Sequence, residues 1–211
     1  MKLAFFMGNF FKISYAFRLN LINSLPLDHG LANQKNNGVK GSKVYLTYVF
    51  AANADGSEKR LPLIIGKAHK PQYFKNKTGE MLGFLYQNNA KAWMTSELYQ
   101  EWLMKWNYEL QLWNCHILLL QDNFAGHICL KGLTNIKVKN FGPNLTTHVQ
   151  PMDAGIIHCF KAHYHARYIQ RAIDHYDFNF SPTQIYNINQ LEAIRIAELA
   201  WHDVDVTSIF H

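Results

Sequence analysis

The sequence is poor in cysteine, in acidic residues relative to basic ones, and in long apolar runs. Its three cysteines, Cys115, Cys129 and Cys159, are odd in number and form no Cys-x-x-Cys pair. A disulfide framework is therefore not expected, and a reducing compartment fits better. No stretch approaches the roughly 18 continuous apolar residues of a membrane span, so a membrane protein is not expected either.

What is present fits one folded domain. The chain has 211 residues, of which 48% are hydrophobic and 14% aromatic, enough to build a core and to exclude a disordered chain. Lysine and arginine number 21 against 15 aspartate and glutamate, a formal net charge of +6. That excess favours an anionic partner such as nucleic acid, although many ordinary soluble domains are mildly basic.

The first half of the chain predicts a β-hairpin. Residues 44–52 are rich in Val, Tyr, Leu, Thr and Phe, as in a strand, and the Asp55-Gly56 pair marks a turn. A second apolar run covers 61–65, and Pro62 inside it favours an edge strand or a bulge. The two runs and the turn between them are typical of a hairpin.

The second half of the chain predicts alternating helices and strands. Helices are expected over 95–112, 152–176 and 188–202, and strands over 116–120 and 136–138. The first helix has Thr95 or Ser96 as a capping residue and apolar side chains at helical spacing. Alternation of this kind indicates an α/β sandwich.

Asp122 directly follows the predicted strand at 116–120. In open α/β sheets, ligands bind at the carboxyl ends of strands, where a carboxylate can hold a hard cation. An Asp before Asn123 can also simply begin a turn. The pattern alone leaves both interpretations open.

Asp153 lies at the predicted start of the long helix, two residues after Pro151. A carboxylate there interacts favourably with the helix dipole and needs no further function. The alternative is a second metal ligand. Two carboxylates from separate elements can hold Mg²⁺, and a two-metal site activates a nucleophile and stabilises the leaving oxygen of a phosphodiester.

Several blocks of the sequence, taken in order, resemble the pogo/Tigger group of DDE transposases, with their jerky-like and centromere protein B-like relatives. The blocks are 51–59, 61–67, Lys70-Pro71, 89–95, Asp122-Asn123 with His127, Pro143-Asn144, Gln150-Pro151-Met152-Asp153-Ala154-Gly155 and the final helix. The resemblance covers about residues 25–205. Several blocks in order are far more specific than any one motif.

The resemblance implies an α/β, ribonuclease H-like fold, in which helices flank a central mixed sheet. It divides the chain into an uncertain N-terminal segment (1–20), a DDE-type domain (21–180) and a C-terminal helical extension (181–211). The sequence of residues 1–20 leaves open whether the first strand of this fold is complete.

The family cuts and joins DNA with three acidic residues and a divalent metal. Asp122 matches the second acidic residue and Asp153 the third. The resemblance therefore implies Mg²⁺ or Mn²⁺ as cofactor if the chain is active, DNA as partner and the nucleus as location. The resemblance does not decide whether the chain forms a homo-oligomer.

The first acidic residue of the family has no counterpart here. Its position falls near Phe17 or Arg18, in a stretch (15–20) without any carboxylate, and Asp28 and Asp55 lie in neighbouring turns. Mg²⁺ requires near-octahedral oxygen ligands, so two carboxylates of three should hold it poorly. The sequence thus predicts a transposon-derived domain with impaired catalysis.

Basic residues supply candidate contacts to DNA phosphates. They are Lys67, Lys70, Lys161, Arg167 and Arg171. An ordinary solvated surface is an equal alternative for each, because phosphate contacts have no sequence code. The histidines near the long helix (His158, His163 and His165) have no zinc-site spacing, so metal–histidine chemistry is not expected.

Three functions remain open from the sequence. The chain is a DDE-type endonuclease, active or lapsed; or a non-catalytic DNA-binding or chromatin-associated module; or a transposase fragment without function. Salt-dependent DNA binding without cleavage would favour the second.

Overall fold

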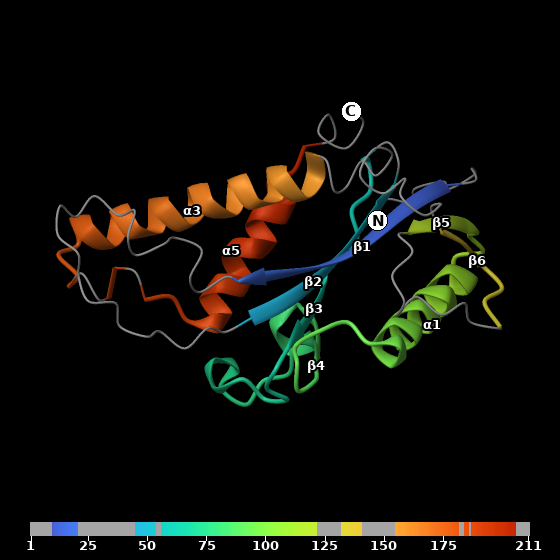
Figure 1. Ribbon diagram of the computed structural model, residues 1–211, viewed down its shortest axis with the longest axis horizontal. Helices are drawn as coiled ribbons and strands as arrows, with labels where there is room; N and C mark the ends of the chain where they lie inside the picture. Colours follow the sequence, from blue (N-terminus) through green and yellow to red (C-terminus); the bar gives the residue numbers. More distant parts are fainter. Residues whose placement is uncertain are drawn as a thin grey trace.

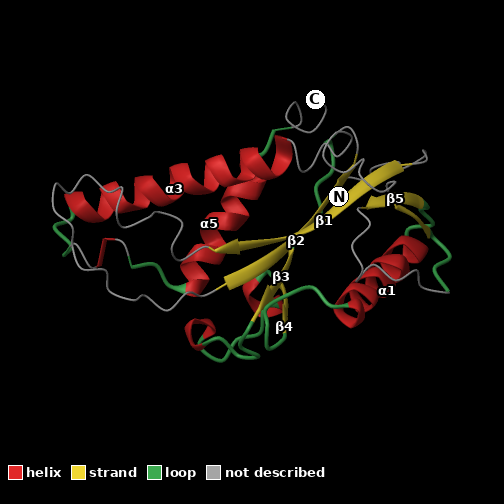
Figure 2. Ribbon diagram, viewed as in Figure 1, coloured by secondary structure: helices red, strands yellow, loops and turns green. Residues whose placement is uncertain are grey.

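The computed structural model describes residues 10–20 (as a backbone strand), 45–53, 56–121, 132–140, 155–181, 184–185 and 187–205. These residues form one mixed sheet with helices on both faces (Figures 1 and 2). Among them, no helix is both long and apolar enough to cross a membrane.

The described sheet has six strands in the order β4-β3-β2-β1-β5-β6. The strands are β1 (Phe10–Asn20), β2 (Tyr45–Asn53), β3 (Leu63–Gly66), β4 (Leu85–Asn88), β5 (Ile117–Gln121) and β6 (Ile136–Asn140). β2 is antiparallel to β1 and β3, and the other neighbouring pairs are parallel. Only β2 therefore runs against the rest, and the other strands have their carboxyl ends towards the same edge.

The predicted hairpin is confirmed as β2 and β3. The expectation that Pro62 would make its second strand an edge strand is wrong. The alternative, a bulge, agrees with the register, because one extra residue lies between the Ala52–Lys59 bridge and the Val49–Leu63 pair, in the segment 60–62 that contains Pro62. β3 begins at Leu63, after the proline, and it pairs with β2 on one side and β4 on the other. Because Pro62 precedes the strand, its missing N–H removes no bond from the ladder.

The first described strand lies inside the sheet. β1 pairs with β2 from Lys12 to Asn20 and with β5 from Phe10 to Ser14, so it is an interior strand of the sheet. Its parallel pairing with β5 requires the intervening chain to cross over, and α1 is part of that connection.

Two layers of helix cover the sheet. α1 (Ser96–Leu112) lies on one side of it, and α3 (Ile157–Asp177) and α5 (Gln190–Asp203) lie together on the other (Figure 1). The predicted cap of α1 is confirmed, since the Thr95 side chain accepts a hydrogen bond from the Leu98 amide. Asn189 caps α5 through the Glu192 amide in the same way.

The chain between β3 and β4 contains two short 3₁₀ helices, η1 (Gln72–Phe74) and η2 (Glu80–Leu82).

Two hydrophobic clusters meet at β2, whose described residues are buried except for Tyr45. One cluster joins Tyr48 and Phe50 to α3 and α5, including Phe160 and Trp201; the Phe50 and Trp201 rings are 4.3 Å apart. The other joins the opposite face of the sheet to α1 and includes Leu103 and Trp106. The C-terminal segment predicted as an extension thus contributes α5 to the core.

Candidate functional site: the carboxyl ends of β5 and β6

A hydrogen-bonded polar group fixes the end of β5. The buried Gln121 accepts a hydrogen bond from the Tyr99 hydroxyl of α1, and its Nε2 donates to Asn140 Oδ1 of β6 over 2.8 Å. The end of β5 is therefore tied to both its neighbouring strand and the helix beneath it. Asp122 is the next residue in the sequence and lies outside the described residues.

β1 lies beside this end. Ser14 of β1 pairs with Gln121, whereas Phe17 lies three residues further along β1, where it pairs with Tyr48 of β2. The match of the family's first acidic position to Phe17 or Arg18 stays a prediction. Neither position nor any other in β1 supplies a carboxylate, because β1 contains neither Asp nor Glu from Phe10 to Asn20.

Asp153 lies outside the described residues, as do Asp28, Asp55 and His127. α3 has its first residue at Ile157, four residues after Asp153. The pairing of Asp122 with Asp153 therefore stays a prediction.

Within the ranges that the structure describes, no group of three or more His, Cys, Asp or Glu residues could hold a metal ion. Glu58 follows β2, and its carbonyl oxygen accepts a hydrogen bond from the Asn53 amide. Asn53 is level with Lys12 of β1 and, through it, with Leu119 of β5, so β2 and β1 lie between Glu58 and β5. This sideways separation of three strand spacings places Glu58 poorly to replace the missing first carboxylate.

Three of the predicted phosphate contacts are on the surface but are not brought together. Lys67 and Lys70 follow β3 and are exposed, and Lys161 is exposed on α3. The end of β3 is also staggered from the end of β5. Ile65 of β3 pairs with Thr47 of β2, which pairs with Arg18 of β1, whereas Gln121 of β5 pairs with Ser14 of β1. Measured along β1, the ends of β3 and β5 are therefore four residues apart, which is about 13 Å.

The other two predicted phosphate contacts bind within the chain. Arg167 forms an ion pair with Asp203 of α5 at 2.6 Å. Arg171 pairs with Glu192 at 2.5 Å and donates to the carbonyl oxygens of Ile185 and Asn187 at 2.8 Å each. These guanidinium groups hold α3 to α5, so phosphate binding would compete with structural contacts.

The groups with shifted pKa on the α3 and α5 side are shifted mainly by burial. Burial and the nearby Lys161 lower the pKa of His165 on α3. Burial also lowers the pKa of Lys59, although its Nζ donates to the carbonyl oxygens of Trp201, His202 and Val204 at the end of α5. That lysine satisfies helix-end carbonyls, a structural role.

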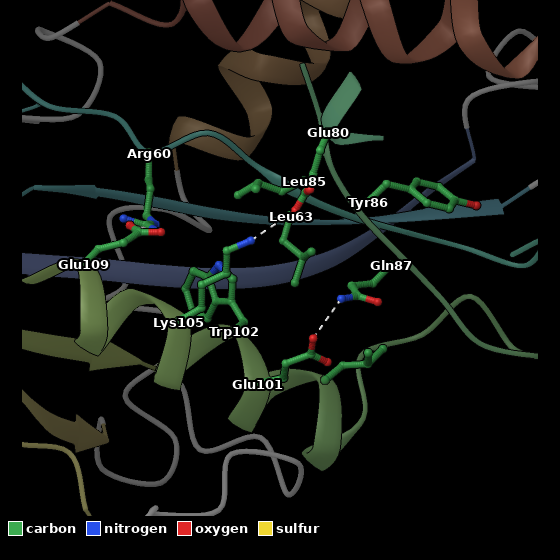
Figure 3. A pocket seen from close by; sticks show the side chains of 11 residues that line it. Arg60, Leu63, Glu80, Leu85, Tyr86, Gln87, Glu101, Trp102, Lys105 and Glu109 are labelled. Carbon is green, nitrogen blue, oxygen red and sulfur yellow. Dashed lines mark hydrogen bonds and ion pairs between the residues drawn. The ribbon is translucent and has the colours of Figure 1, made fainter. Parts of the chain in front are cut away.

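A small pocket lies between α1 and the β3–β4 side of the sheet (Figure 3). Its charged side chains are engaged with one another: Arg60 with Glu109 at 2.6 Å, and Lys105 with Glu80 at 3.3 Å. Gln87 donates to Glu101 across the same space. The charged and polar side chains named here are therefore paired with one another, and they give no indication of a ligand.

The strand order, the single antiparallel central strand and the helices on both faces define a ribonuclease H-like α/β fold. Residues 43–211 match the family model described as DDE superfamily endonuclease, and this chain belongs to that family.

The curated relatives agree with the predicted pogo/Tigger grouping. Mouse "Tigger transposable element-derived protein 4" is 27% identical over 164 residues, which are 78% of this chain and 31% of that protein. Human "Tigger transposable element-derived protein 7" is 29% identical over 197 residues, covering 82% and 35%. "CENP-B homolog protein 2" of Schizosaccharomyces pombe is 26% identical over 181 residues, covering 81% and 34%. The chain spans about a third of the length of these relatives.

Among solved structures, a chain of a "pre-cleavage Mos1 transpososome" aligns with a TM-score of 0.43 and 12% identity, over 95% of this chain and 56% of that one. A likeness at this level adds nothing to the family assignment.

Proposed function

We propose that this chain is a transposase-derived domain that binds DNA in the nucleus and has lost most of its strand cleavage. The observation that carries the proposal is the composition of β1. This strand pairs with β5, which ends one residue before Asp122, and β1 has no carboxylate along its length. The net charge of +6 supports an anionic partner. One relative bears the name "ARS-binding protein 1".

Asp122 and Asp153 are the two residues that would hold Mg²⁺ or Mn²⁺ in the family's chemistry. Such ions activate the attacking oxygen and stabilise the leaving one. Two ligands of three leave the metals under-coordinated, and removing a carboxylate from a two-metal site should cost orders of magnitude in rate. The fold and the net positive charge do not depend on that chemistry, so binding can persist without cleavage.

A nicking assay tests the lost activity. Supercoiled plasmid is incubated with the protein in Mg²⁺ or Mn²⁺, beside the Asp122→Ala variant. Wild type and variant should give the same background nicking. Robust nicking by the wild type that Asp122→Ala abolishes would show a working acidic site and contradict the proposal.

DNA binding is tested separately, by fluorescence anisotropy of a labelled 30-base-pair duplex at several salt concentrations. We expect binding whose logarithmic affinity falls linearly with the logarithm of salt concentration, as for phosphate contacts. If a folded, soluble chain shows no binding at low salt, the DNA-binding half of the proposal fails. A fragment without function would then be the better description.

A further inference from the structure

Two lysines on β6 stand beside the strand end that precedes Asp122. Lys137 and Lys139 are both exposed, and they lie two residues apart, so they share one face of the strand. β6 is the last strand in the described sheet order, next to β5. The hydrogen bond from Gln121 to Asn140 ties the ends of these two strands together.

The face that carries these lysines is the one opposite to α1. Ile136 and Val138, which alternate with them, pack into the cluster beneath α1. Lys137 and Lys139 therefore project to the other side of the sheet, where their paired residues on β5 are Leu118 and Leu120.

The strands beside these lysines carry no acidic residue. Neither β5 nor β6 contains Asp or Glu, and β1 contains none from Phe10 to Asn20. An anion approaching this half of the sheet therefore meets no acidic residue from the three strands themselves. Clustered charge of one sign attracts a polyanion before any specific contact forms.

We propose that Lys137 and Lys139 bind neighbouring phosphates of a DNA strand at the carboxyl ends of β5 and β6. Lysines two apart on a strand are separated by about 6.6 Å, so their long, flexible stems can each reach a separate phosphate. This inference rests on the proposed DNA binding and specifies where on the domain that binding occurs. Neither lysine is among the phosphate contacts predicted from the sequence.

Exposed lysines on a terminal strand have another well-known use, which is to prevent edge-to-edge pairing of sheets. The two roles predict different results. Protection of the edge would alter self-association and leave DNA affinity unchanged. Phosphate binding would alter both the affinity and its salt dependence.

The test compares two double variants of equal charge change, Lys137→Gln/Lys139→Gln and Lys91→Gln/Lys105→Gln. Lys105 is on α1, which covers the other face of the sheet, and Lys91 precedes that helix; both are exposed. Affinity for the labelled duplex is measured from 50 to 200 mM salt. Thermal unfolding verifies that each variant is folded.

We expect the β6 variant to lower the salt slope by about 1.8, since each lost phosphate contact contributes about 0.9. Its affinity at 0.1 M salt should fall by about tenfold or more. The control should change both quantities much less. Equal losses in both variants would mean binding by overall charge and would overturn the inference.

An unchanged affinity in the β6 variant, with the wild type binding, would overturn this inference and leave the proposed DNA binding intact. No binding by the folded wild type would instead remove the proposed function itself. The two failures are therefore distinguishable.

Discussion

At the scale of single residues, the arginines of α3 serve the fold. Arg171 is the more buried of the two, with a side chain 11% exposed, and it contacts one carboxylate and two carbonyl oxygens. A guanidinium in such a position is difficult to replace, because its planar fork satisfies several acceptors at once.

Arg171→Ala should lower the free energy of unfolding by about 2–3 kcal/mol, since it removes the ion pair with Glu192 and the hydrogen bonds to two carbonyl groups. Arg171→Lys should have an intermediate effect. Urea unfolding followed by circular dichroism measures both. Lys105→Ala is the control: its ion pair with Glu80 is exposed, so its loss should cost no more than about 0.5 kcal/mol.

The same variant tests the original prediction that Arg171 binds phosphate. With its stability loss accounted for, Arg171→Ala should leave the salt slope of DNA binding unchanged. A slope lower by about one contact in the folded variant would return Arg171 to the DNA interface.

The sequence could not distinguish these roles, because an arginine on a helix looks the same whether its partner is a phosphate or a distant carboxylate. Glu192 is 21 residues from Arg171 in the chain, and only the packing of α5 on α3 brings them together. The alternation of lysine with Ile136 and Val138 is visible in the sequence. It indicates a phosphate contact beside Asp122 only once the pairing of β6 with β5 is known.

At the scale of elements, the sequence predicted most of what local pattern determines. The strand of the hairpin, the capped helix α1 and the buried strand β5 each combine a strong periodicity with a recognisable boundary. The parallel partner of β3 could not be read in the same way, since pairing between distant strands has no local signal. The register that sets Ser14 level with Gln121 has no local signal either, because register is set by the assembled sheet.

α5 is an integral element, and Trp201 tests this. Its ring is 5% exposed, lies 4.3 Å from the ring of Phe50, and its Nε1 donates to the Arg60 carbonyl. Trp201→Ala should lower the free energy of unfolding by about 3–5 kcal/mol. Trp113→Ala is the matched control, because that side chain is 69% exposed and should contribute no more than about 0.5 kcal/mol.

Denaturant unfolding measures the two tryptophan variants. A loss for Trp201→Ala as small as that of Trp113→Ala would mean that α5 is only loosely attached. The description of residues 181–211 as a mere extension would then be the better one.

At the scale of the whole molecule, β2 is the common member of both helical layers. Tyr48 and Phe50 pack towards α3 and α5, while Val49 and Ala51 pack towards α1. A strand buried on both faces cannot lose one layer without exposing apolar surface on the other side. The two layers should therefore unfold together, and a change made in one should be felt in the other.

Leu103→Ala tests that coupling from the α1 side. Leu103 is 1% exposed, so the cavity should cost about 2–5 kcal/mol. Native-state hydrogen exchange should show the same loss of protection for the amides of α5 as for those of α1. Leu112→Ala, 66% exposed on the same helix, should leave both unchanged. If Leu103→Ala lowered protection in α1 alone, the layers would be independent units, and α3 and α5 could hold their part of the sheet without α1.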